Sequence, residues 1–169
     1  GGTGPKAGAL AAFIGLLALV SHYDGRLAAA GFVDVDTPYN RVIVFDGAEV
    51  GSGRPIRVMV TGPQGRQSAM YLDHPTELAV PYTRWYRLVE HFVPGMKRLL
   101  VLGGGGYSFP KYALANYPTA AVDVVEIDPG ITRLARERFG LKDHPRLWIA
   151  EEDGRTFLNR NRRTYDAIL

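Results

Sequence analysis

The sequence contains no cysteine, so it can form neither a disulfide framework nor a metal site built from thiolates. Its charge excess is small, because 20 Lys and Arg residues stand against 17 Asp and Glu residues. The basic residues are scattered, apart from a short cluster at Arg160, Arg162 and Arg163 that is typical of a solvated helix end. No nucleic-acid-binding motif is present. We therefore expect no nucleic-acid partner and no metal, and the lack of cysteine fits a reducing compartment.

The sequence also lacks an initiator methionine, and residues 165–169 have the pattern of a strand with no loop after it. We therefore take the chain to be a fragment of a longer protein. Its 46% of hydrophobic and 22% of charged residues are ordinary for a globular domain. A length of 169 residues is enough for one domain with a small appendage.

An uninterrupted apolar run covers residues 7–20 and has no polar face. It is shorter than the roughly 20 residues that a bilayer span needs. We favour a transmembrane helix cut at its start, while a signal-type segment and a buried helix of a soluble domain remain alternatives. The predicted boundaries are a truncated transmembrane or apolar helix over residues 1–21 and a linker over residues 22–31.

Alternating hydrophobic and polar residues then predict short strands at residues 32–36, 41–45, 55–60 and 67–72. Turn-forming residues separate these strands. We expect a small antiparallel β unit over residues 32–80.

From residue 81 a helical pattern leads into regular alternation of β and α segments up to residue 169. Such alternation predicts a parallel sheet with right-handed crossovers, and hence an α/β fold of the Rossmann type that is incomplete at its C-terminus. Ligands of these sheets bind at the carboxyl ends of the strands.

Three features fall at those strand ends. The first is the loop Gly103, Gly104, Gly105 and Gly106, which follows a buried strand and lets a ligand approach the backbone closely. Ser108, a few residues later, is expected to cap the next helix.

The second feature is Glu126, which ends the next strand about 20 residues after the loop, the usual place of a ribose-hydroxyl acceptor. Asp128 is expected to cap the following helix. The third feature is Asp153 with Gly154 after the third parallel strand, where a carboxylate could accept a hydrogen bond from an adenine amino group, or could cap a helix instead. Together the three features predict a nucleoside pocket.

These motifs, with the sequence Glu126-Ile127-Asp128-Pro129 and the pair Tyr165-Asp166, resemble the spermidine synthase (polyamine aminopropyltransferase) family. The upstream strand led by Tyr39 adds to the resemblance, which covers about residues 37–169. The stretch Gly105–Pro110 looks most like the branch in which such a domain is fused to membrane helices.

The resemblance implies a class I AdoMet-methyltransferase-like Rossmann domain that transfers an aminopropyl group from decarboxylated AdoMet to a polyamine such as putrescine. It implies contacts of the donor with Gly103, Gly104, Gly105, Gly106, Glu126, Ile127, Asp153 and Gly154, and of the substrate with Gln67 and Tyr82. The catalytic base would be an aspartate just after Leu169. The resemblance also implies a membrane-associated protein. We expect its catalytic domain to be cytoplasmic because the nucleotide donor is made there, and a homodimer stays open.

Two positions depart from the pattern of the family. Gly106 stands where the family usually has an aspartate that helps to hold the aminopropyl end, and Thr83-Arg84 replaces a His-Glu pair after Tyr82. If Arg84 faced the pocket, it would favour the carboxylate of ordinary AdoMet over a polyamine. We therefore keep two alternatives, an AdoMet-dependent methyltransferase and a non-catalytic, membrane-tethered nucleoside-binding module.

Overall fold

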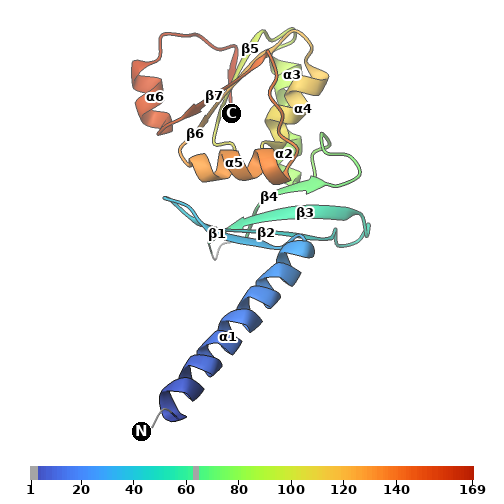
Figure 1. Ribbon diagram of the computed structural model, residues 1–169. Coiled ribbons are helices and arrows are strands. Elements are labelled where there is room, and N and C mark those ends of the chain that lie inside the picture. The colour runs from blue at the N-terminus through green and yellow to red at the C-terminus, as the bar shows by residue number, and fades with distance from the viewer. Residues whose placement is uncertain (1–3, 63–64) are drawn as a thin grey trace.

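The computed structural model describes residues 4–62 and 65–169, which form a long helix, a small antiparallel sheet and a parallel sheet with helices on both faces (Figure 1). The predicted α/β fold and the order of these parts along the chain are therefore confirmed.

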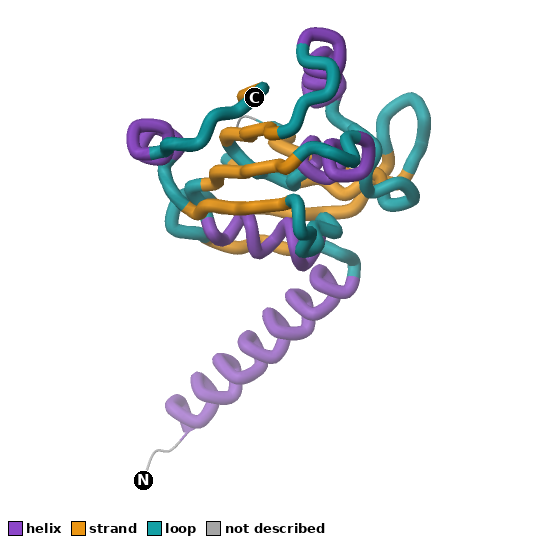
Figure 2. Tube along the Cα trace, turned by 90° about the horizontal axis from the view of Figure 1, so that it is seen from above, coloured by secondary structure: helices purple, strands orange, loops and turns teal. Residues whose placement is uncertain are grey.

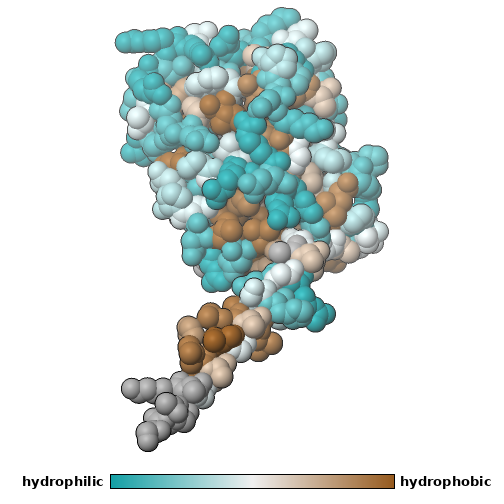
Figure 3. Space-filling view, viewed as in Figure 1, coloured by the Kyte–Doolittle hydropathy of each residue, from teal (hydrophilic) through white to brown (hydrophobic). Residues whose placement is uncertain are grey.

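The first helix, α1 (Gly4–Ala29), projects away from the rest of the molecule as a rod (Figure 1). Its segment Gly8–Leu27 has 20 residues and is long and apolar enough to cross a membrane, a test that a signal segment also passes. None of that segment is buried against the protein, and Figure 3 shows its apolar side chains gathered in the open. The helix continues through most of the segment that we expected to be a linker, and it ends just before Gly31, whose φ of +79° suits a helix terminus.

The small sheet consists of β1 (Val33–Asp36), β2 (Arg41–Ala48), β3 (Pro55–Thr61) and β4 (Arg66–Tyr71). Its strands pair antiparallel in sequence order. Between Met59 and Val60 the pairing of β3 with β4 shifts register, which marks a β-bulge in the last strand. This bulge lies beside the candidate site described below.

A helical stretch then runs through α2 (Pro81–Trp85), the 3₁₀ turn η1 (Tyr86–Leu88) and α3 (Val89–Phe92). The alternating part follows. Its elements are β5 (Arg98–Leu102), α4 (Ser108–Asn116), β6 (Ala121–Glu126), α5 (Pro129–Arg138), β7 (Leu147–Glu151), α6 (Gly154–Arg160) and β8 (Ala167–Ile168).

The four strands of the second sheet are parallel and follow the order β7-β6-β5-β8. Figure 2 shows the strands of the molecule from above, lying side by side. Alternate strand residues face opposite sides. Leu99 and Val101 pack with α4 and α5, whereas Leu100 packs with Phe157 of α6. The strand order reverses beside β5, so its carboxyl end is where a ligand of this fold is expected to bind.

The small sheet lies against α5 of the parallel domain (Figure 1). Val42, Val44 and Met59 are fully buried from one side of this contact, and Ile131 and Phe139 close it from the other. The burial of these apolar side chains is the main force that holds the two sheets together.

Polar contacts add to this apolar interface. The hydroxyl of Thr37 donates to Asp128 Oδ2 at 2.5 Å, and the guanidinium of Arg57 in β3 donates to the backbone oxygen of Arg138 at 2.7 Å. The ammonium of Lys111 in α4 reaches Met70 Sδ of β4 at 3.2 Å. These contacts fix the position of the small sheet relative to the strand ends of the parallel sheet.

Candidate active site

A cavity of about 220 Å³ lies at the carboxyl end of β5. It is enclosed by the glycine loop, the start of α4, the end of β6, strand β4 and helix α2. The lining residues are Gln67, Ser68, Tyr82, Thr83, Tyr86, Val101, Leu102, Gly103, Gly104, Gly105, Ser108, Phe109, Pro110, Glu126 and Leu169. The cavity is thus shared between the small sheet and the parallel domain.

The glycine loop takes a shape that side chains would obstruct. Gly103 and Gly105 have φ values of +93° and +52°, which glycine adopts without strain. A Cβ on Gly104 would lie 2.3 Å from the ring of Tyr107, so the loop rests directly on this ring. Tyr107 is itself fully buried, has a φ of 53°, and shares a hydrogen bond of 2.8 Å with the hydroxyl of Thr132. The glycine loop therefore packs on Tyr107, which is hydrogen-bonded to α5, and the backbone of the loop faces the cavity.

Glu126 joins the glycine loop to the neighbouring strand end. Its Oε2 accepts the backbone N–H groups of Gly104 and Gly105 at 2.7 and 3.3 Å, and its Oε1 accepts that of Asp128 at 2.9 Å. The side chain is buried yet lines the cavity. Because a carboxylate offers about four lone-pair positions, Glu126 retains the capacity to accept a hydrogen bond from a ligand hydroxyl.

Asp128 acts as the N-cap of α5, as the sequence predicted. Its Oδ1 accepts the backbone N–H of Gly130 at 2.9 Å, while its Oδ2 accepts the hydroxyl of Thr37. It is completely buried and does not line the cavity.

Six of the predicted site residues line the cavity together: Gln67, Tyr82, Gly103, Gly104, Gly105 and Glu126. Tyr82 donates its hydroxyl to the backbone oxygen of Gln67 at 3.3 Å, and burial raises the pKa of this hydroxyl. Both residues come from outside the parallel sheet and form the wall opposite the glycine loop.

The other four predicted residues do not line the cavity. Gly106 is buried beside it, and Ile127 lies at the end of β6 with its side chain partly exposed. Asp153 caps α6 by accepting the backbone N–H of Thr156 at 2.8 Å, which lowers the pKa of the carboxyl.

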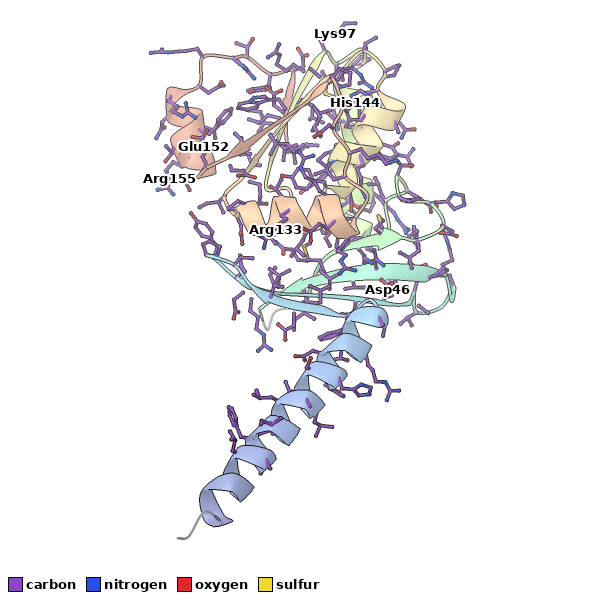
Figure 4. All side chains as sticks on the ribbon, in the orientation of Figure 1. Asp46, Lys97, Arg133, His144, Glu152 and Arg155 are labelled. Carbon is purple, nitrogen blue, oxygen red and sulfur yellow. The ribbon has the colours of Figure 1, made fainter. Side chains whose placement is uncertain are left out.

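Gly154 begins α6, and a Cβ there would lie 3.6 Å from Leu102, a lining residue. The start of α6 is thus close to the cavity without forming its wall. Figure 4 labels Glu152 and Arg155, the sequence neighbours of this pair, on the side of the sheet away from α2 and α4.

One expectation about a neighbouring residue, Ser108, is corrected, and the position of Arg84, which the sequence left open, is settled. Ser108 does not cap α4, because its hydroxyl donates to the backbone oxygen of Ala69 at 3.1 Å. Arg84 does not face the cavity: its Nε donates to the backbone oxygen of Leu78 at 2.9 Å, and its guanidinium also reaches the hydroxyl of Tyr71.

Several lining residues were not predicted, among them Ser68, Tyr86 and Phe109. Tyr82, Tyr86 and Phe109 stack edge to face in a row, with ring centroids 5.7 and 5.3 Å apart. Their spacing in the sequence is that of ordinary core positions, so no local pattern marks them as site residues. Among the lining side chains that the structure describes, Glu126 alone is charged at neutral pH.

No family-level sequence profile matches the chain. Among individual proteins, the polyamine aminopropyltransferase of Chromobacterium violaceum is 31% identical over 122 residues, which are 72% of this chain and 47% of that protein. The eEF1A lysine and N-terminal methyltransferase homolog of Drosophila melanogaster is 32% identical over 61% of this chain but only 15% of its own length.

Solved structures show the same fold. A probable spermidine synthase from Corynebacterium glutamicum superposes with a TM-score of 0.62 at 24% identity, over 76% of this chain and 47% of that chain. Human methyltransferase-like protein 13 in complex with SAH superposes with a TM-score of 0.50 at 24% identity, over 53% of this chain and 46% of that chain. The chain thus spans about half the length of the aminopropyltransferase that it matches. These sequence relatives and the shared fold support the spermidine synthase (polyamine aminopropyltransferase) family for the segment that they share with this chain.

Proposed function

We propose that the cavity binds the nucleoside of decarboxylated AdoMet and that the protein transfers its aminopropyl group to a polyamine such as putrescine. In this proposal Glu126 accepts from the ribose hydroxyls, and the backbone of Gly103, Gly104 and Gly105 passes beneath the nucleoside and its sulfur. Asp153, beyond the cavity but at the same edge of the sheet, would accept from the adenine amino group with the lone pairs that its cap leaves free.

The observation that carries the proposal is the charge of the cavity. Glu126 is its one charged side chain among the described lining residues, and it is negative. Decarboxylated AdoMet is a cation at its sulfonium and at its amine, whereas ordinary AdoMet adds a carboxylate that would need a positive or hydrogen-bond-donating partner. Arg84, a cation that could have served a carboxylate, is held on the backbone oxygen of Leu78 instead.

The proposed reaction forms a bond between the amine nitrogen and the carbon beside the sulfonium while the bond from that carbon to sulfur breaks. Methylthioadenosine leaves, and a base accepts the proton of the amine. Glu126 is unsuited to be this base, because its carboxylate already accepts three backbone N–H groups and holds the glycine loop and the start of α5 in place. We therefore propose a base beyond Leu169, as the resemblance to the family implies.

An AdoMet-dependent methyltransferase is the second candidate, because relatives named as methyltransferases match part of the same segment. The two functions differ in which donor binds more tightly. A non-catalytic module would bind the nucleoside and transfer nothing.

Calorimetric titration of the full chain in detergent with decarboxylated AdoMet, AdoMet and methylthioadenosine tests the proposal. We expect decarboxylated AdoMet to bind more tightly than AdoMet, and Glu126→Gln to weaken binding of all three at least about tenfold, the effect of one charge-assisted hydrogen bond. Glu151→Gln is the matched control, since Glu151 ends the neighbouring strand β7 and does not line the cavity. A preference for AdoMet would favour the methyltransferase, and no binding of any of the three would reject a nucleoside site.

We also propose that α1 anchors the protein in a membrane with the catalytic domain on the cytoplasmic side, as in the membrane-fused branch of the family. Support comes from the 20-residue span Gly8–Leu27, which corresponds to about 30 Å of helix and is not buried against the part of the chain that the structure describes. Protease protection of the domain in sealed inside-out vesicles would contradict this orientation, because there the cytoplasmic face is exposed. A homodimer stays a prediction.

A further inference from the structure

Two buried serine hydroxyls meet at one wall of the cavity. Ser68 lies in β4 of the small sheet and Ser108 is the first residue of α4, and each is only 6% exposed. Both line the cavity, and their hydroxyl oxygens are 3.4 Å apart. The pair therefore brings together two segments that are 40 residues apart in the sequence.

The bulge in β4 explains why Ser68 reaches the cavity. Consecutive residues of a regular strand point to opposite faces, yet Gln67 and Ser68 both line the cavity. Ser68 pairs with Met59 and Arg66 pairs with Val60, so Gln67 is the extra residue on this strand. A bulge of this kind re-aims a side chain, and here it places two consecutive polar residues at one ligand-sized space.

The hydrogen bonds of the pair decide which groups it can bind. Ser108 donates its single proton to the backbone oxygen of Ala69. In the contact between the two serines, Ser68 must then be the donor and Ser108 the acceptor. Both hydroxyl protons are thus used in hydrogen bonds within the protein. The remaining lone pairs of both oxygens can accept hydrogen bonds from a ligand. The pair thus presents acceptors to the cavity and no donor.

Gly106 is closely linked to Ser68. A Cβ on Gly106 would lie 2.5 Å from Ser68 Oγ and 3.2 Å from Ser68 Cβ. The hydroxyl of Ser68 therefore occupies the space into which any side chain at position 106 would extend. At this place in the cavity wall, the polar group is the hydroxyl of Ser68 from the small sheet and not a side chain of the glycine loop.

We propose that Ser68 and Ser108 form a subsite for a primary ammonium group and thereby select a donor that ends in an amine without a carboxylate. The inference rests on the proposed function, since it concerns the end group of the same nucleoside donor. An ammonium carries three N–H donors that suit two acceptor oxygens. A carboxylate placed there would meet only lone pairs and no donor.

The test compares two ligands on the full chain in detergent, using calorimetry. Decarboxylated AdoMet carries the terminal ammonium, whereas methylthioadenosine has the same nucleoside and sulfur without it. Ser68→Ala removes one acceptor and leaves the bond from Ser108 to Ala69 in place. We expect this variant to weaken binding of decarboxylated AdoMet about tenfold, as the loss of a hydrogen bond to a charged group does, and to leave binding of methylthioadenosine within about twofold.

Ser52→Ala is the control, because Ser52 also donates its hydroxyl to a side chain but lies in an exposed turn of the small sheet. It should change neither affinity. If Ser68→Ala leaves the ratio of the two affinities unchanged while methylthioadenosine still binds, the ammonium subsite is wrong and the nucleoside site stands. If the unaltered chain does not bind methylthioadenosine, the proposed function fails, and the subsite fails with it.

Discussion

Replacing Gly106 by alanine should destabilise the protein, although Gly106 is not among the glycines with a positive φ and alanine could adopt its backbone conformation. The added Cβ would lie 2.5 Å from Ser68 Oγ, 3.0 Å from Phe139 Cδ1 and 3.2 Å from Ser68 Cβ. Contacts below 3.0 Å require atoms to move, and all three neighbours are buried. The neighbours belong to β4 and to the end of α5, so the strain acts on the interface between the two sheets.

Overpacking of a buried site by one methyl group costs about 1–3 kcal/mol. For a chain of this size such a loss lowers the midpoint of thermal unfolding by roughly 2–4 °C per kcal/mol. We therefore expect Gly106→Ala to lower the midpoint by about 3–10 °C in the same detergent, measured by circular dichroism.

A second substitution tests whether the contact with Ser68 causes this loss of stability. Ser68→Ala removes the oxygen that lies 2.5 Å away but keeps the two carbon contacts, so the double variant should recover part of the loss. This recovery is a coupling between two residues in direct contact and would appear as a non-additive term in a double-mutant cycle. A Gly106→Ala variant as stable as the unaltered chain, or a double variant in which the two losses simply add, would refute the packing that we describe.

Two further predictions concern the interface between the sheets. Asp128→Ala should cost about 1–2 kcal/mol from loss of the α5 cap alone, and more because the hydrogen bond from Thr37 across the interface is also lost. Thr37→Val should lower the urea midpoint less, since the cap to Gly130 remains. Burial lowers the pKa of Lys111 to about 8, whereas an unfolded lysine titrates near 10.4. The unfolded chain therefore binds more protons between these values, and stability should rise from about pH 8 to pH 10 by an amount on the order of 2–3 kcal/mol. Lys111→Met should abolish that rise in urea titrations, and an unchanged pH profile in this variant would show that Lys111 is not the group responsible.

Local patterns were sufficient to predict the elements of this fold and part of the site. Alternating residues identified the small sheet, and the glycine loop with Glu126 was placed correctly at adjacent strand ends because the carboxyl ends of parallel strands share one edge. The cap formed by Asp128 follows from its position before Pro129. Each of these inferences depends on residues that are close together in the sequence.

The side chains that the sequence left open, missed or misplaced are those whose direction is set by distant contacts. Arg84 could face the cavity or the loop before α2, and its hydrogen bond to the backbone oxygen of Leu78 decides the matter. Ser68 faces the cavity because of a bulge whose register depends on pairing with β3. Ser108 makes its hydrogen bond to the small sheet and not to its own helix, since Ala69 offers an acceptor within reach. The sequence around each residue is compatible with both outcomes.

The turn between β6 and α5 positions both walls of the cavity. Glu126 holds the glycine loop through two backbone N–H groups, and Asp128, two residues later, holds the small sheet through Thr37. The N–H of Asp128 is in turn bound by Glu126, so the two carboxylates form one connected network. A displacement of the small sheet would therefore move Gln67 and Ser68 away from the loop and act on Glu126 through the same turn. Donor binding and the docking of the two sheets should thus be coupled, and variants at the interface should weaken nucleoside binding even though they touch no ligand.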